Sequence, residues 1–221
     1  MNKINAITKA CAINDTIFKE LTDTFCFKTE KEIEQFILKR FKQHNVKPSY
    51  PPIVANNNAN IHPKPRKKKL ERGFIVLDFA CTYKGWCSDM TRMLFVGTPT
   101  KHEKKVYNLV LACQQKCVNK VKPGTRVADL DLYARSLLGK YKPYFKHSLG
   151  HGIGRKIHEQ PKISIFSDEI IKKNDVITIE PGIYVKHKKK EMGIRVEDTI
   201  VVGRKNKILT KSTKKLVQVK L

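Results

Sequence analysis

The stretch IVLDFACTYKGWCSDMTRMLFVG, residues 75–97, contains the pattern that decides the fold of this chain. An apolar run ends in Asp78, a turn around Gly85 follows, and a second apolar run returns after Asp89. Two apolar, β-branched runs separated by such a turn are typical of a β-hairpin. A carboxylate at the end of a buried strand is costly unless a partner compensates its charge, so both acids need an explanation.

The stretch VITIEPGIYVKHKKKEMGIRVEDTIVVG, residues 176–203, repeats this design. Its first apolar run ends in Glu180, and a returning strand expected over residues 193–202 carries Glu197. Any one of the four acids could be an ordinary strand-end residue or a salt-bridge partner. Four of them in two matching hairpins are better explained by one shared cation site, because clustered carboxylate oxygens bind divalent cations.

Between the hairpins lies HSLGHGIGRKIHEQP, residues 147–161, in which histidines alternate with glycines. A lone histidine is usually packed or exposed, but His147, His151 and His158 within such a short, glycine-rich segment indicate a site. An imidazole beside carboxylate oxygens suits Mn, Fe, Co or Zn. Four carboxylates are too many for an ordinary single zinc site, whereas they can bridge two divalent ions.

Helical patterns lie on both sides of the first hairpin. Apolar residues recur at helical spacing over residues 4–21 and again over 127–138. Thr29 and Thr100 are each followed by Glu three residues later, and this capping-box pattern predicts that a helix begins at each. From residue 147 onward the chain is rich in strand-forming residues. This order of elements predicts an α+β fold.

The chain has 221 residues, 40% of them apolar, and contains no linker long enough to separate two domains. We therefore expect one domain over residues 1–221, with no separate N-terminal domain. No apolar run approaches the ~20 residues of a membrane span, and the N-terminus does not resemble a signal peptide. A cytoplasmic protein is the simplest interpretation. Its six cysteines would then be reduced thiols, with Cys113 and Cys117 on one face of a helix.

The net charge of +25 raises the question of a nucleic-acid partner. Most of the positive residues are lysines, whereas phosphate and base recognition favour the planar fork of arginine. The lysines are spread along the whole chain, and neither an RNP-like strand nor zinc-finger spacing is present. The charge therefore predicts a solvated, lysine-rich surface, and nucleic acid is not expected as a partner.

These segments resemble the catalytic domain of the pita-bread metallopeptidases, which include methionine aminopeptidase, aminopeptidase P and prolidase. The resemblance extends from about Ile4 to Val202 and is most specific at DFACTYKGWCSDMTR, HSLGHGIGRKIHE, TIEPGIY and GIRVEDT. It implies a pseudo-symmetric α+β fold of the creatinase/aminopeptidase type, with an antiparallel sheet and helices on its outer face. It also implies two divalent metal ions at the centre, with Mn as the expected metal and Co, Fe or Zn as alternatives.

The resemblance assigns metal-binding roles residue by residue. Asp78 is expected to bind one ion, and Asp89 and Glu197 to bridge both. His151 and Glu180 are expected to hold the other ion. Two such ions would lower the pKa of a shared water and polarise a peptide carbonyl, which is the chemistry that amide hydrolysis needs.

Other residues are expected to act on the substrate. Glu180 either accepts the proton of the attacking water or acts as a ligand alone. His62, in the loop before the first hairpin, and His158 would hydrogen-bond the peptide or the developing oxyanion. By the same resemblance His147 and Arg195 also belong to the substrate-binding residues.

The expected activity is removal of the N-terminal residue from peptides, chiefly those with proline in second place. An arginine at Arg195, two residues before Glu197, is the pattern of aminopeptidase P and prolidase. An arginine at Arg155 is instead the pattern of methionine aminopeptidase. A methionine aminopeptidase is therefore the first alternative, and a non-enzymatic homologue that binds protein or RNA is an alternative of another class. Peptides are the expected partners of a chain that is monomeric or weakly self-associating.

Overall fold

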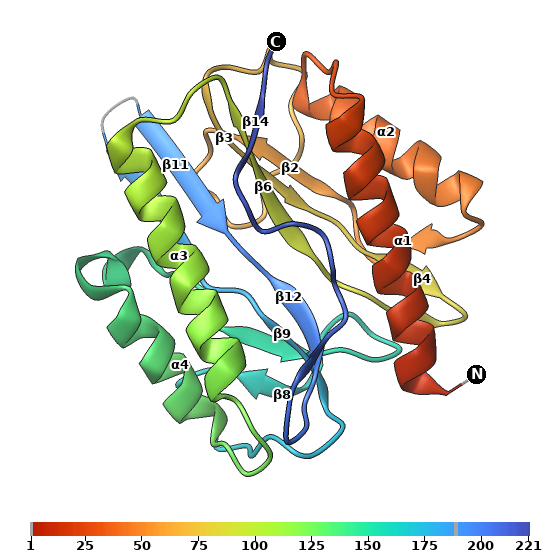
Figure 1. The fold of residues 1–221 in the computed structure, drawn as a ribbon, viewed down its shortest axis with the longest axis vertical. Helices are drawn as coiled ribbons and strands as arrows, with labels where there is room; N and C mark the ends of the chain where they lie inside the picture. The colour runs from red at the N-terminus through yellow and green to blue at the C-terminus, as the bar shows by residue number, and fades with distance from the viewer. Residues whose placement is uncertain (1, 188–189) are drawn as a thin grey trace.

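Two larger β-sheets, two small ones and two pairs of helices make up the computed structural model, which describes residues 2–187 and 190–221 (Figure 1). The helices are α1 (Lys3–Asp23), α2 (Glu30–Gln43), α3 (Lys101–Lys120), α4 (Val127–Leu137) and the 3-10 helix η1 (Gly139–Tyr144). The strands are β1 (Lys47–Pro48), β2 (Ile53–Asn56), β3 (Gly73–Asp78), β4 (Cys81–Tyr83), β5 (Trp86–Cys87), β6 (Thr91–Val96), β7 (Gly150–Gly152), β8 (Glu159–Ile163), β9 (Val176–Ile179), β10 (Gly182–His187), β11 (Lys190–Arg195), β12 (Asp198–Val201), β13 (Lys207–Ile208) and β14 (Val217–Val219).

The fold has two halves, and in each of them a pair of helices packs against β-strands. α1 and α2 pack against β2, β3 and the small β4–β5 hairpin, whereas α3 and α4 pack against β8, β9 and β11 (Figure 1). The predicted α+β class, with pseudo-symmetric halves, largely antiparallel strands and helices on the outside, is confirmed. None of the described helices combines the length and the apolarity that crossing a bilayer requires.

The first sheet has the strand order β14-β6-β3-β2. β3 and β6 are the antiparallel strands predicted within residues 75–97, with Asp78 opposite Thr91. Ile75 packs in the cluster formed with α1 and α2, whereas its neighbour Val76 packs in the cluster formed with α3 and α4. Because both faces of β3 are buried, its sequence is continuously apolar instead of alternating. β14 pairs with β6 in parallel, and the other pairs of this sheet are antiparallel.

The second sheet has the order β13-β12-β9-β7-β8, and its antiparallel β9 and β12 place Ile179 opposite Asp198. The single returning strand expected over residues 193–202 was wrong. The chain breaks at Val196 and Glu197, where β11 ends its pairing with β10 and β12 enters the second sheet. Glu197 therefore lies at a bend between two strands, where its side chain can point to the centre of the molecule.

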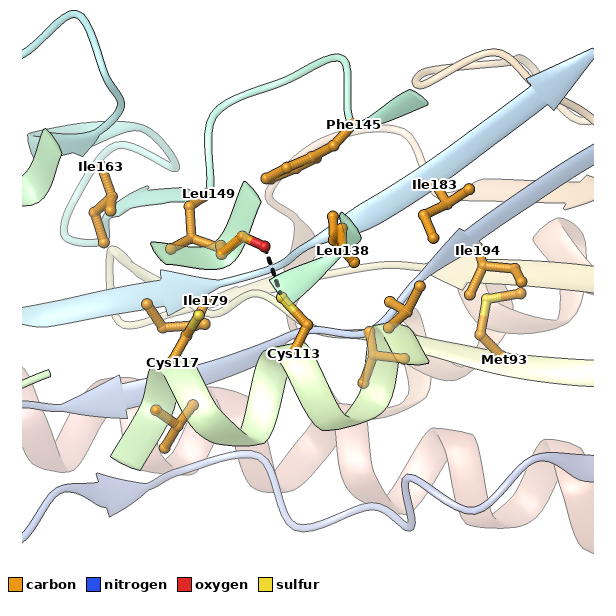
Figure 2. Packing of buried hydrophobic residues seen from close by; sticks show 14 of the residues in the cluster. Met93, Cys113, Cys117, Leu138, Phe145, Leu149, Ile163, Ile179, Ile183 and Ile194 are labelled. Atoms are coloured by element: carbon orange, nitrogen blue, oxygen red, sulfur yellow. Dashed lines mark hydrogen bonds between the residues drawn. The ribbon is translucent and has the colours of Figure 1, made fainter. Parts of the chain in front are cut away.

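The predicted helix starts are confirmed. The side chains of Thr29 and Thr100 each accept a hydrogen bond from the backbone N–H three residues on, and Glu103 completes the box at α3. Cys113 and Cys117 share the inner face of α3, as expected, and pack among apolar residues of the second half (Figure 2). The Cys113 Sγ lies 3.5 Å from the Ala134 carbonyl oxygen, which accepts its weak hydrogen bond.

A buried ion pair joins the two halves. The Arg92 Nη2 on β6 donates to the Asp198 Oδ1 on β12 at 2.8 Å, and neither side chain is more than 1% exposed. Gln114, Thr210 and Lys214 also donate to this carboxylate. Burial alone would raise the pKa of Asp198, but Arg92 and Lys214 outweigh it and lower the pKa. The carboxylate is thus ionised and fully partnered at the junction.

We expect Asp198→Asn to destabilise the fold by about 3–5 kcal/mol, because it leaves Arg92 buried without a counter-charge. Urea unfolding followed by circular dichroism measures the change. Asp168→Asn is the matched control, since Asp168 is exposed, and such surface changes stay within about 0.5 kcal/mol. Equal stability of Asp198→Asn and the parent would show that the pair does not hold the halves together.

Candidate metal centre

The ends of the two hairpins meet at the centre of the molecule and bring five predicted residues together. Asp78 ends β3, Asp89 precedes β6, and His151 lies in β7. Glu180 follows β9, and Glu197 occupies the bend between β11 and β12. All five line one pocket of about 500 Å³.

The distances describe a compact cluster. The His151 Nε2 lies 3.6 Å from the Asp89 Oδ2 and 3.4 Å from the Glu180 Oε1. Asp89, His151 and Glu197 each offer one ligand atom, and these three atoms lie within 4.8 Å of one another. Oxygen and imidazole donors at such spacing are the donor set that Mn, Fe, Co or Zn accept.

Two threonines orient the acids reciprocally across the junction. The Thr91 hydroxyl, two residues after Asp89, donates to the Glu197 Oε2 at 2.8 Å. The Thr199 hydroxyl, two residues after Glu197, donates to the Asp89 carbonyl oxygen at 2.8 Å. Each hairpin thus fixes the acid-bearing segment of the other, which is the kind of supporting hydrogen bond that orients ligands in metal sites.

A third threonine supports the His151 side of the cluster. The Thr178 hydroxyl donates to the Glu180 Oε1 at 3.1 Å and accepts the backbone N–H of His151 at 3.0 Å. The His151 Nδ1 lies 3.0 Å from the Gly152 carbonyl oxygen. Since a carbonyl oxygen only accepts, Nδ1 carries the proton and Nε2 presents its lone pair to the cluster.

Arg195 and Tyr50 partner Asp78. The Arg195 guanidinium donates to the Asp78 Oδ2 and to the Thr91 hydroxyl. The Tyr50 hydroxyl contacts the Oδ1 atoms of both Asp78 and Asp89. Tyr50 was missed from the sequence, because it stands beside two prolines in what appeared to be a plain loop and nothing local marks it.

Burial and mutual repulsion set the protonation of the cluster. Burial, with the neighbouring carboxylates, raises the pKa of Asp89 and of Glu197 well above their usual values. Burial raises the pKa of Glu180 to about 8 and lowers that of His151 to about 4. Among the described side chains, the single guanidinium of Arg195 cannot neutralise four carboxylates. Divalent cations therefore fit the site, because they would relieve this repulsion and hold the acids ionised.

His147 lies beside Glu180 in a hydrogen-bonded relay, with its Nδ1 3.9 Å from the Glu180 Oε2. Its Nδ1 is 2.8 Å from the Ser148 carbonyl oxygen, and its Nε2 is 3.0 Å from the Tyr184 hydroxyl. Arg195 donates to the same hydroxyl at 2.6 Å. The tautomer follows from the carbonyl: Nδ1 is protonated, so the hydroxyl donates to Nε2 while it accepts from Arg195. Both ring nitrogens of His147 are occupied, and burial lowers its pKa to about 3.

His62 and His158 are exposed at the mouth of the site. The His158 ring lies edge-on to His151, with ring centroids 4.3 Å apart. His62 comes from the loop after β2, and its backbone neighbour Ile61 accepts a hydrogen bond from Arg195 at 3.2 Å. Their exposed side chains can therefore meet a molecule that enters the site.

Two pockets of about 500 Å³ each adjoin the cluster and share His62, His151, His158 and Glu180. The first has a largely apolar wall, formed by Pro51, Pro52, Ile53, Pro63, Pro65 and Ile157. The second is polar, and its lining includes Ser148, Gln160 and Lys162. An elongated molecule could thus span the cluster with unlike groups on either side.

Arg155 lies outside this arrangement. Its guanidinium stacks on the Trp86 ring at 4.7 Å, and the side chain is exposed. It is not among the residues that line either pocket in the described part of the chain. This placement explains Arg155 as a surface cation–π contact.

Comparisons with known proteins agree with this geometry. The model of metallopeptidase family M24 matches residues 5–204. The Xaa-Pro dipeptidase of Pyrococcus horikoshii is 36% identical over 226 residues, which cover 97% of this chain and 63% of the relative. The chain thus spans less than two thirds of the length of the curated relatives it matches.

Solved structures give the same result. The X-Pro aminopeptidase of Thermotoga maritima superposes with a TM-score of 0.92 at 34% identity and covers 98% of this chain and 63% of that one. The prolidase of Pyrococcus horikoshii gives a TM-score of 0.91 at 35% identity, with coverages of 97% and 63%.

The raised carboxylate pKa values predict how the stability of chelator-treated protein depends on pH. The unfolded chain releases a glutamate proton near a pKa of about 4.3, whereas the folded chain keeps that of Glu180 up to about pH 8. The stabilisation of the fold by the Glu180 proton is therefore complete below the pKa of the unfolded chain. It is lost as the pH rises through the pKa of the folded chain. We expect the unfolding free energy to fall between about pH 6.5 and 8, by up to about 1.4 kcal/mol per pH unit for each group that titrates.

Urea unfolding at a series of pH values measures this slope. Between about pH 6.5 and 7.5 the unfolded chain still binds some histidine protons, which offsets part of this decline; above about pH 7.5 the histidines are neutral in both states. Protein loaded with Mn²⁺ is the control, and it should lack the decline because bound cations keep the acids ionised. A chelated protein that gains stability as the pH rises over this range would contradict the raised pKa values.

Proposed function

Because this chain belongs to metallopeptidase family M24, we propose that it is a metal-dependent peptidase that cleaves the bond between a first residue and a proline, chiefly in dipeptides. The observation that carries the proposal is the cluster of four carboxylates and one imidazole between two unlike pockets. The names of the relatives, an Xaa-Pro dipeptidase and an X-Pro aminopeptidase, support the choice of bond.

We infer that two divalent ions bind in the cluster, with Mn as the favoured metal. Their ligands would be Asp78, Asp89, His151, Glu180 and Glu197. When bound, such ions supply a water of lowered pKa and polarise the carbonyl that it attacks. The number of acids supports two ions, since one ion alone would leave several buried carboxylates unbalanced.

Glu180 is the proposed proton acceptor. It lies at the point where the two pockets meet, and as a carboxylate that bound cations would hold ionised it could take the proton of the attacking water. His158 and His62, exposed on the same side, would hydrogen-bond the tetrahedral oxygen and orient the leaving nitrogen. His147 lines the second pocket and would contact the substrate there, whereas Arg195 lines neither pocket and would hold Asp78 and Tyr184 in place.

The two pockets suggest how a dipeptide lies. Its first side chain would fill the apolar pocket beside Ile53 and the prolines, close to the acids that would hold the amine. Its proline would occupy the polar pocket, where Lys162 can pair with the C-terminal carboxylate. Proline has no amide N–H and a fixed φ, so the site need only accept a tertiary amide without a donor.

Two alternatives remain weaker. Arg155 is the residue that favours methionine aminopeptidase, but its side chain stacks on Trp86 and lines neither pocket. It therefore gives no support for a methionine-specific site. A binding protein without activity would have no need for the five clustered donors. The expectation of a cytoplasmic protein that is monomeric or weakly self-associating stays a prediction.

Metal analysis of the purified protein is expected to find about two divalent ions per chain, with hydrolysis lost on chelation and restored by Mn²⁺. Asp89→Asn keeps the shape of the side chain but removes the charge of one of the donors that would hold the ions. We expect it to lower kcat by about 10²-fold or more while the fold is retained. Asp168→Asn, on the surface, is the matched control. Full activity of metal-free protein or of Asp89→Asn would refute the proposed centre.

The substrate prediction compares Ala-Pro, Arg-Pro-Pro and Met-Ala at equal metal loading. We expect kcat/KM to be highest for Ala-Pro and lowest for Met-Ala, by about 10²-fold, because discrimination depends on differential transition-state binding. A clear preference for Met-Ala would replace the proline assignment and leave the metallopeptidase assignment intact.

Lys162 provides a sharper test of the dipeptide assignment. Lys162→Gln should raise the KM for Ala-Pro about tenfold, since it removes one charge-assisted contact, and should leave Ala-Pro amide unchanged because that peptide has no carboxylate. Lys156→Gln, also exposed but absent from the pocket lining, is the matched control. Equal effects of Lys162→Gln on both peptides would mean that Lys162 does not bind the C-terminal carboxylate of the dipeptide.

A further inference from the structure

Three loops come together at the end of the molecule opposite the C-terminus, at the bottom of Figure 1. They are residues 120–124, from the last residue of α3 into the loop before α4, residues 172–175 between β8 and β9, and residues 203–207, from the loop after β12 to the first residue of β13. We call this surface the basic end. None of its residues lines either of the two pockets at the metal centre.

Backbone hydrogen bonds hold the three loops in fixed positions. The Gly124 N–H donates to the Ile171 carbonyl oxygen at 2.8 Å, and the Asn174 N–H donates to that of Val202 at 2.9 Å. The Asn206 side-chain amide donates to the carbonyl oxygens of Val118 and Val121 at the end of α3, at 2.7 and 2.8 Å. These bonds therefore hold the backbones of the three loops in fixed relative positions.

The basic end concentrates positive charge. Its fourteen residues include seven cations, whereas the whole chain has 45 among 221. The seven are Lys120, Lys122, Lys172, Lys173, Arg204, Lys205 and Lys207, and all are exposed. Asp175 is the one acid in these loops, and it already accepts the backbone N–H of Lys172 at 2.6 Å.

These cations lack acidic partners. Among the described residues, none of the seven forms an ion pair. Lys120 lies over the Tyr133 ring at 4.7 Å and in the last turn of α3, so the helix dipole accounts for its position. Lys122, Lys173 and Arg204 line an open hollow of about 810 Å³. Like charges held together in this way repel one another unless an anion lies between them.

The chemistry of the surface favours a phosphate backbone over a protein partner. Stable protein interfaces centre on buried aromatic or apolar anchors, and the large exposed hydrophobic side chains of the described chain lie outside the three loops. Arginine is favoured where phosphates or bases are recognised by a planar fork, but nonspecific contact with a phosphate backbone needs only positive charge, which lysine supplies as a point charge. The even spread of lysines along the sequence argued against nucleic acid, but the fold gathers seven cations from three distant segments.

We propose that the basic end binds the phosphate backbone of nucleic acid, without sequence preference, at a surface separate from the metal centre. Binding would release condensed counterions, so its affinity would fall steeply with salt. Hydrolysis would not depend on it, because the loops contribute nothing to either pocket.

The test measures fluorescence anisotropy of a labelled RNA duplex of about 16 base pairs, a length that one protein module spans. The variant Lys122→Glu/Lys173→Glu/Arg204→Glu changes three cations of the hollow. We expect about a tenfold or greater loss of affinity at low salt, and a log–log salt slope smaller by about two to three, since each lost phosphate contact removes nearly one unit. The kcat/KM for Ala-Pro should be unchanged.

The matched control is Lys9→Glu/Lys39→Glu/Lys105→Glu, which changes exposed lysines of α1, α2 and α3 and gives the same net charge. It should lose far less affinity than the hollow variant. A neutral version, with Gln at Lys122, Lys173 and Arg204, serves if the charge reversal unfolds the chain. Equal losses in both triple variants would assign binding to overall charge and overturn the proposal.

Two further outcomes would also overturn it. One is failure of the parent protein to bind the duplex at about 50 mM salt, where nonspecific phosphate contacts are strong. The other is binding of poly-glutamate or of vesicles with anionic lipids through the hollow while the duplex does not bind, which would assign the surface to an acidic protein or a membrane.

Discussion

The repulsion among four carboxylates at one buried point is the constraint on which the rest of this structure depends. Asp78, Asp89, Glu180 and Glu197 come from four strand ends, and burial strengthens every charge interaction among them. No packing of apolar residues compensates such a cluster. The surrounding chain must therefore supply donors on all sides and leave room for cations, and much of the fold can be understood as the scaffold for that arrangement.

Each half of the fold supplies hydrogen-bond donors to the acids of the other half. Arg92 of the first half pairs with Asp198 of the second, whereas Arg195 of the second half pairs with Asp78 of the first. Thr91 and Thr199 repeat this exchange with hydrogen bonds. Because each half orients the acids of the other, neither hairpin could hold the site alone. The pseudo-symmetry is thus a functional property of the centre as well as a feature of the fold.

The symmetry ends at the substrate side. One pocket is walled by prolines and isoleucines and the other contains Lys162 and polar side chains, although both open onto the same histidines. A symmetric cluster of acids can hold ions, but a peptide has two unlike ends, and under the proposed function the asymmetric pair of pockets would give it one orientation. The hydrogen bonds from His147 through Tyr184 to Arg195 lie on the side of the second pocket only, and they fix the position of His147 in its lining.

Local sequence was sufficient for most features that depend on backbone periodicity, although it did not show the break at Val196 and Glu197. The two hairpins, the helix starts at Thr29 and Thr100 and the four strand-end acids were predicted because strand alternation, capping and turn chemistry act within a few residues. Tertiary structure alone decided the contacts across the junction: Tyr50 on two acids, the pairing of Asp78 with an arginine 117 residues away, and the gathering of lysines from three loops. Such contacts leave no periodic trace in the sequence, because they depend on how distant segments pack and not on the conformation of any one segment.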